Sequence, residues 1–172
     1  MTQELIDLRK SILEGRYVDA LAIVDELEGM SKQAILRNIQ SYLKIMLIHL
    51  IKNQVEKRLT NSWANSIRNS IREIKKLNLQ DNKTSYYIKL DEWALTIEEE
   101  FEEAIREASL EAFKGIYNEF EFTPMVDKAQ VIEIAQRLLA LTYSYSVKEL
   151  PAIVAENLTQ LPGGEDWKAG RR

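Results

Sequence analysis

Apolar residues between positions 36 and 50 recur at steps of three and four, the spacing of one face of an α-helix. Ser31 can cap such a helix, and the pattern predicts one helix over about residues 32–58. The repeating positions are Leu36, Ile39, Leu43, Met46, Leu47 and Leu50. The middle of the segment is apolar nearly all round, which is typical of a central helix that its neighbours cover on several sides. The chain is therefore expected to build a helical bundle around this segment.

The rest of the chain carries further helical patterns. Helices are predicted over residues 3–14, 18–28, 62–77 and 127–142, and a last one opens at the capping box of residues 146–149. A long acidic helix is predicted over about residues 84–118, because its apolar residues repeat with near-heptad spacing. This acidic-helix seam comprises Leu90, Ala94, Ile97, Phe101, Ala104, Ala108 and Ala112. With only 6 Gly and 3 Pro to shape β-turns, the predicted fold class is all-α, an antiparallel bundle of five or six helices.

Glycine and proline mark where helices are expected to end. Gly15 and Gly29 follow periodic segments and are predicted to end the first and second helices. Pro124 disfavours helix at the residue before it, and Asp127 can cap the helix that follows. Pro151 stands late for the first turn of the last helix, so a kink is expected there.

Length and composition indicate one domain. A chain of 172 residues can bury a sizeable core, and residues 1–160 are predicted to form a single helical-bundle domain. Residues 161–172 combine two glycines with mixed charge and are predicted to be a flexible tail, in which Trp167 docks onto the bundle or onto a partner. The chain has no cysteine, which excludes disulfides and thiolate metal sites. No apolar run approaches the length of a membrane span and no secretory signal opens the chain, so a cytoplasmic protein without membrane contact is expected.

Charge is unevenly distributed along the chain. Net charge is −4 over residues 1–30, +8 over residues 31–76 and −9 over residues 91–121. Two interpretations fit this pattern. In the first, the basic helices and the acidic helix face each other and neutralise their charges within the fold. In the second, the basic segment presents a face to phosphate groups.

The basic face of the second interpretation comprises Lys52, Lys57, Arg58, Arg68, Arg72, Lys75 and Lys76. Its last four members lie on one side of the helix predicted over residues 62–77, and the other side is apolar. That apolar side comprises Trp63, Ile67, Ile71, Ile74 and Leu77. A basic stripe gains affinity for nucleic acid through counterion release at any base sequence. The isoelectric point of about 5.2 argues against a dedicated nucleic-acid-binding protein.

The only histidine, His49, lies at the end of the most apolar part of the central helix. It shares a helical stripe with Tyr42, Met46 and Asn53, and it is predicted to be a structural, hydrogen-bonded residue at the edge of the core. Trp63 is predicted to anchor the next helix in the core. His49 and Trp63 are therefore placed at the edge of the possible binding site.

No catalytic or metal-binding pattern stands out. Glu99, Glu103 and Glu107 share a stripe, but di-iron bundles need two Glu-x-x-His motifs and this chain has one histidine. The stripe is interpreted as a solvent-facing surface that pairs with Arg106. Phosphate-binding glycine loops are absent, and no serine stands in a nucleophile elbow. We expect no cofactor, no metal and no enzymatic activity.

Several short motifs occur in a characteristic order over about residues 14–75. They are Gly15-Arg16-Tyr17, Glu26-Leu27-Glu28-Gly29-Met30, His49-Leu50-Ile51-Lys52, Ser62-Trp63, and Ile67-Arg68 followed by Ile71. In this order and spacing the chain resembles the bacterial, largely cyanobacterial, domain of unknown function 29 family. The resemblance implies an all-helical fold and a cytoplasmic bacterial protein, and it implies no activity or catalytic residue. The first residues lack the aromatic-rich opening that is usual in that family.

The organisation is also similar to that of helical-bundle ribonucleases, which place an arginine a few residues before a histidine. Here Lys44 stands five residues before His49, and lysine lacks the bidentate grip of a guanidinium on phosphate. We therefore predict binding in place of catalysis. The leading hypothesis is a protein–protein interaction module that binds a protein partner or associates with itself through the acidic helix and its seam. The alternative is a nucleic-acid-associated protein, of defence or toxin–antitoxin type, that uses the basic face.

Overall fold

A computed structural model describes residues 2–80 and 84–171 and confirms the all-α fold. The helices are α1 (Gln3–Leu13), α2 (Tyr17–Glu56), α3 (Asn61–Asn78), α4 (Trp93–Glu111), α5 (Glu119–Phe122), α6 (Lys128–Ser144), α7 (Leu150–Leu158) and α8 (Gly164–Lys168). Three 3-10 turns are interspersed: η1 (Leu90–Glu92), η2 (Ala112–Gly115) and η3 (Thr123–Met125). The chain divides into two compact units, Met1–Asn38 and Ile39–Arg172. No helix of the described residues is long and apolar enough to cross a membrane.

The first unit, the N-terminal hairpin, consists of α1 and the first part of α2. Gly15 forms the turn with a φ of +75°, as the sequence predicts, and the Arg16 amide donates to the carbonyl of Ser11 at 2.8 Å. Among the described residues of this unit only Ser11 and Ala20 are buried. The hairpin therefore has almost no core of its own.

The predicted break at Gly29 is wrong, because α2 continues through it. A glycine inside a helix costs only about 1 kcal/mol, which the residues on either side of it can outweigh. A Cβ placed at Gly29 would meet no atom within 4 Å, so packing does not require glycine there. The predicted central helix over residues 32–58 is thus the second half of a longer helix that ends at Glu56.

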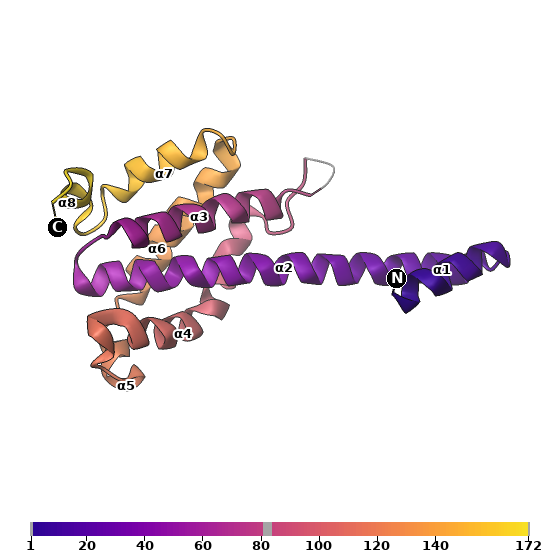
Figure 1. Ribbon diagram of the computed structural model, residues 1–172, viewed down its shortest axis with the longest axis horizontal. Coiled ribbons are helices and arrows are strands. Elements are labelled where there is room, and N and C mark those ends of the chain that lie inside the picture. The colour runs from indigo at the N-terminus through magenta and orange to yellow at the C-terminus, as the bar shows by residue number, and fades with distance from the viewer. Residues whose placement is uncertain (1, 81–83, 172) are drawn as a thin grey trace. The chain divides into compact units, whose positions relative to one another are not determined.

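The second unit holds the hydrophobic core. Figure 1 shows the part of α2 from residue 39 onward lying between α3 and α4, with α6 crossing behind. Helix α6 contacts both α3 and α4, and α7 packs on α3 and α6. The α2 side chains Ile39, Leu43, Met46, Leu47 and Ile51 are fully buried, which confirms this segment as the central helix. The apolar side of α3 is confirmed as well, since Ile67, Ile71 and Ile74 are fully buried; Leu77 is only partly so.

The acidic helix is shorter than predicted. It begins at Trp93, because the Asn78 side chain holds Ile88 in an extended segment by accepting from its amide at 2.7 Å and donating to its carbonyl at 2.9 Å. It ends at Glu111, because Phe113 and Lys114 adopt φ of +52° and +59°, a left-handed backbone that no α-helix tolerates.

The acidic-helix seam lies inside the second unit. Five of its seven residues are fully buried: Ile97, Phe101, Ala104, Ala108 and Ala112. Leu90 and Ala94 are exposed. Most of the seam is therefore used within the second unit.

The C-terminal part contains a helix that the sequence analysis does not predict. Ser146 and Glu149 form the predicted reciprocal capping box, but Pro151 lies in the first turn of α7 and produces no kink there, because a first-turn residue needs no amide hydrogen bond. Residues 161–172 were predicted to be a flexible tail, whereas the described part of this segment contains α8 and the buried side chain of Leu161.

Candidate functional site at the join of α2 and α3

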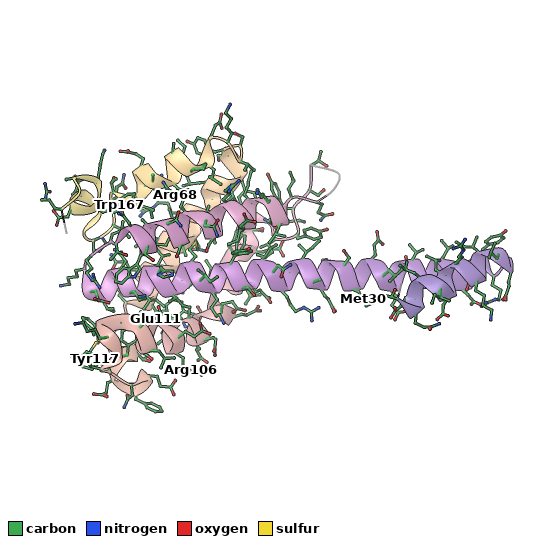
Figure 2. The ribbon with its side chains drawn as sticks, in the orientation of Figure 1. Met30, Arg68, Arg106, Glu111, Tyr117 and Trp167 are labelled. Atoms are coloured by element: carbon green, nitrogen blue, oxygen red, sulfur yellow. The ribbon has the colours of Figure 1, made fainter. Side chains whose placement is uncertain are left out.

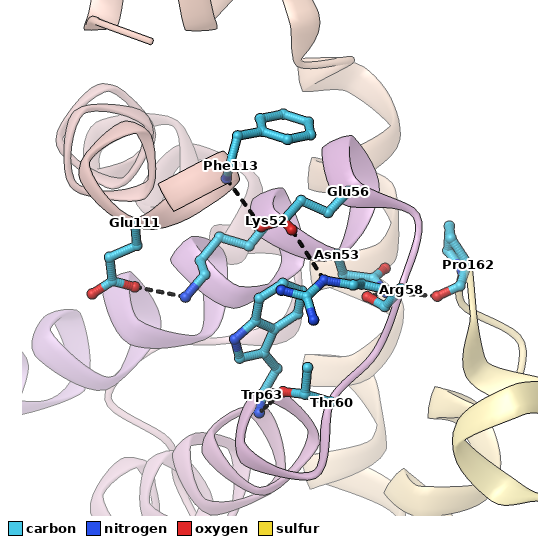
Figure 3. Close-up of polar contacts among 9 residues, drawn as sticks. All are labelled: Lys52, Asn53, Glu56, Arg58, Thr60, Trp63, Glu111, Phe113 and Pro162. Carbon is cyan, nitrogen blue, oxygen red and sulfur yellow. Dashed lines mark hydrogen bonds and ion pairs between the residues drawn. The ribbon is translucent and has the colours of Figure 1, made fainter. Parts of the chain in front are cut away.

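The join between α2 and α3 is fixed by hydrogen bonds. Lys57 ends α2 with a φ of +56°, and its amide donates to the carbonyl of Asn53 at 2.9 Å. The Asn53 side chain is 1% exposed and donates to the carbonyls of Arg58 at 2.9 Å and Pro162 at 2.8 Å (Figure 3). One buried amide thus holds both the turn after α2 and the C-terminal segment.

Trp63 lies in the core at the start of α3, as predicted, and it is 7% exposed. Thr60 caps the helix by accepting from the Trp63 amide at 3.1 Å. The Lys52 ammonium and the Arg58 guanidinium each lie 4.7 Å from the centre of the indole ring (Figure 3). The quadrupole of the ring favours these cations, and each contact contributes about 0.5–2 kcal/mol.

Both cations also have carboxylate partners. Lys52 Nζ lies 2.7 Å from Glu111 of α4, and the Arg58 Nε lies 3.0 Å from Glu56. The second oxygen of Glu56 accepts from the amide of Phe113 at 3.3 Å, so this carboxylate also holds the left-handed turn after α4. Lys52 is only 6% exposed, and its charge is used inside the fold.

The C-terminal segment packs closely on the join. Gly163 has a φ of +72°, and a Cβ there would lie 2.6 Å from the Cα of Arg58. A Cβ on Gly164 would lie 2.4 Å from two carbonyl oxygens of α7 and the residue after it. Trp167 Nε1 donates to Asn61 Oδ1 at 2.9 Å, which fixes the indole over the start of α3. Arg171 pairs with Asp166 at 2.8 Å.

Between these elements lies a cavity of about 530 Å³. The join lines it with Lys57, Arg58, Leu59, Thr60, Asn61 and Ser62, and the C-terminal segment lines it with Gly163, Asp166, Trp167, Gly170 and Arg171. We call this space the join cavity. Three cations and one carboxylate line it, so its walls carry a net charge of +2.

The predicted basic face does not form one surface. Lys52 is buried against Glu111; Lys75, whose pKa burial lowers, donates to the carbonyl of Thr142; and Lys76 pairs with Glu73 at 3.7 Å. Arg68 (Figure 2) and Arg72 lie on α3 outside the lining of the join cavity and have no ion pair among the described residues. Lys57 and Arg58 alone of the seven line the cavity.

Neutralisation within the fold, the first interpretation of the charge pattern, occurs at two contacts between α2 and α4. Lys44 pairs with Glu107 and Lys52 with Glu111, both at 2.7 Å. The hydrogen bond that Lys44 donates to Glu107 raises the pKa of Lys44. The predicted pair of Arg106, which is labelled in Figure 2, with Glu103 is also present, and Arg106 bonds Glu119 of α5 at 3.1 Å as well.

A hydrogen bond was predicted for His49, and none is present at its Nδ1 within the described chain. Its Nδ1 is buried and has no partner among the described residues. Burial, followed by the nearby charge of Lys52, lowers the pKa of His49 to about 4, so the ring is neutral at pH 7. It does not line the join cavity.

No group of three or more His, Asp or Glu side chains within the described ranges 2–80 and 84–171 could hold a metal ion. Of the predicted glutamate stripe, Glu103 and Glu107 are engaged by Arg106 and Lys44. The groups that line the join cavity are cations, hydrogen-bonding side chains, one carboxylate and an indole ring.

A family described as Domain of unknown function DUF29 matches residues 3–137. The chain belongs to this family. The DUF29 match extends the resemblance seen over residues 14–75 to α1 at one end and into α6 at the other. It ends before α7 and α8, so one wall of the join cavity lies beyond the residues matched to DUF29. No curated protein and no solved structure matches the chain.

The sequence analysis identified part of each wall of the join cavity. Lys57 and Arg58 were singled out by their charge, and Trp167 was predicted to dock onto the bundle or onto a partner; it docks on Asn61 of α3. Asn61 and Arg171 were not predicted as site residues. The Gly163-Gly164 pair was the available signal, because paired glycines in a short segment mark a place where backbone can approach backbone closely.

Proposed function

We propose that this protein acts by binding and not by catalysis, as a protein-interaction module that self-associates through its N-terminal hairpin. One observation carries the proposal: large apolar side chains are exposed on both helices of the hairpin. They are Leu5, Ile6, Ile12, Leu13, Tyr17, Val18, Leu21, Val24 and Met30, the last of which is labelled in Figure 2. More than half of the large apolar residues exposed in the described chain belong to this unit.

The two helices of the hairpin leave most of their apolar side chains exposed, so these side chains need a further element to cover them. Several of these residues are far from buried: Leu13 is 78% exposed, Val18 82% and Leu21 64%. Exposed apolar side chains that gather on one unit in this number are typical of an interaction site. A second copy of the hairpin would supply two more helices and complete a four-helix bundle with two-fold symmetry.

Charge supports a second copy as the occupant. Helix α1 exposes Arg9 and Lys10, and α2 exposes Asp25, Glu26 and Glu28. None of the five has an ion pair among the described residues. If α1 of one copy lies against α2 of the other, the cations of each copy meet the anions of its partner, so one arrangement satisfies both apolar and charged groups.

The experiment measures molar mass by size-exclusion chromatography with light scattering across the micromolar range. Wild type is expected to form a dimer, and the double variant L21E/V24E a monomer, because the new carboxylates would be buried in the interface. The matched control is L95E, since Leu95 of α4 is 67% exposed in the other unit. A monomeric wild type, or a dimer that survives L21E/V24E, would overturn the proposal.

A further inference from the structure

We infer that the join cavity binds a small phosphate ester that carries a flat ring, the chemistry of a mononucleotide. The inference stands apart from self-association, because the join cavity belongs to residues 57–62 and 163–171 and the hairpin to the first unit. Its volume, about 530 Å³, lies within the range of sites that enclose small organic ligands.

The cations of the cavity have capacity for a phosphate. Lys57 is exposed and has no ion pair among the described residues. Arg58 bonds Glu56 through Nε, and no hydrogen bond within the described chain engages its two terminal nitrogens. A guanidinium can hold two phosphate oxygens at once, and a neighbouring ammonium adds a point charge. Arg171 likewise bonds a carboxylate through Nε, but its partner Asp166 itself lines the cavity and repels a phosphate, so Arg171 contributes less.

Trp167 supplies a surface for a flat ring. Its Nε1 is bound to Asn61 Oδ1, so the indole is held in a fixed orientation at the cavity wall and has no polar edge left to satisfy. Stacking of a base on an aromatic side chain contributes about 10-fold or more to affinity. The hydroxyl of Ser62, also in the lining, provides a further polar contact.

The walls are held in place before any ligand arrives. Asn53 ties the carbonyl of Arg58 to that of Pro162, and Gly163 allows the two backbones to touch. A preorganised site loses little entropy on binding. A free mononucleotide fits this arrangement better than a nucleic-acid strand, because Arg68 and Arg72, which would extend a phosphate track, lie outside the cavity lining.

Isothermal titration calorimetry with AMP, GMP, inorganic phosphate and adenosine tests the inference on the full chain. AMP or GMP is expected to bind at least about tenfold more tightly than phosphate or adenosine, since only the nucleotides engage both cations and indole. K57G removes one cation yet keeps the left-handed backbone, which glycine adopts readily, so the fold is retained. It should weaken nucleotide binding about fivefold or more, and W167L should do the same.

R72Q is the matched control, because Arg72 is an exposed cation of α3 outside the cavity. It should leave nucleotide affinity unchanged. The inference is wrong if neither AMP nor GMP binds at about 1 mM, or if K57G and W167L bind as wild type does. It is equally wrong if a single-stranded oligonucleotide binds, the mononucleotides do not, and R72Q reduces that binding.

Discussion

Acidification should destabilise this protein through His49. In the folded chain burial lowers the pKa of His49 to about 4, whereas an unfolded histidine titrates near 6.5. Between these values the unfolded chain binds a proton that the folded chain does not. Lowering the pH therefore favours unfolding, and the stability present above pH 6.5 is lost progressively as the pH falls towards 4.

The magnitude follows from the two pKa values. Each pH unit between them is worth about 1.4 kcal/mol, which sets a ceiling of about 3 kcal/mol. About half of this maximum stabilisation is lost between pH 7 and pH 5, and the partial exposure of the His49 ring makes the loss smaller. The expected loss of unfolding free energy from His49 alone is about 1–2 kcal/mol.

Urea denaturation followed by circular dichroism at pH 7, 6 and 5 measures this loss in wild type and in H49Q. The variant keeps the carboxylates that also titrate, so the difference between the two pH profiles isolates His49. Wild type should lose about 1–2 kcal/mol more than H49Q between pH 7 and pH 5. Parallel profiles, or a wild type that gains stability on acidification, would refute the assignment of a buried neutral histidine.

Two further substitutions test the join itself. N53A removes the buried amide that serves two carbonyls, and it should lower the unfolding free energy by about 2 kcal/mol, seen as a lower urea midpoint at an unchanged slope. G163A should lower the unfolding free energy by at least about 2 kcal/mol, because alanine resists a φ of +72° and its Cβ would lie 2.6 Å from the Cα of Arg58. G29A is the contrasting variant and should leave the unfolding free energy unchanged or raise it. Position 29 lies within α2, and no atom lies within 4 Å of the added carbon.

The fold class was predictable because the apolar residues that form the core recur in the sequence with helical spacing. Ile67, Ile71 and Ile74 were identified as the inward side of α3, and all three are fully buried. The boundaries were less predictable. Gly29 lowers helix stability only slightly, so α2 continues through it. The end of α4 depends on the left-handed turn at residues 113 and 114, which neighbouring side chains such as Glu56 stabilise.

The candidate site was predictable only in part, because charge alone does not say where a side chain points. Lys52 and Lys57 look alike in sequence, yet Lys52 is 6% exposed beside Glu111, whereas Lys57 is exposed and lines the join cavity. The second wall of the join cavity comes from residues about 100 positions further along the same chain; Trp167, for example, contacts Asn61. No local pattern joins such distant segments, and only their tertiary contact reveals the cavity.

Sedimentation equilibrium of two charge-reversed variants, alone and mixed, tests the central claim most directly. R9E/K10E places anions on both helices of the hairpin, and D25K/E26K places cations on both, so each variant alone should remain near the monomer mass of 20.0 kDa. An equimolar mixture should form a heterodimer of twice that mass, because α1 of each variant then opposes complementary charge on α2 of the other. A mixture that stays at the monomer mass would contradict self-association through the N-terminal hairpin.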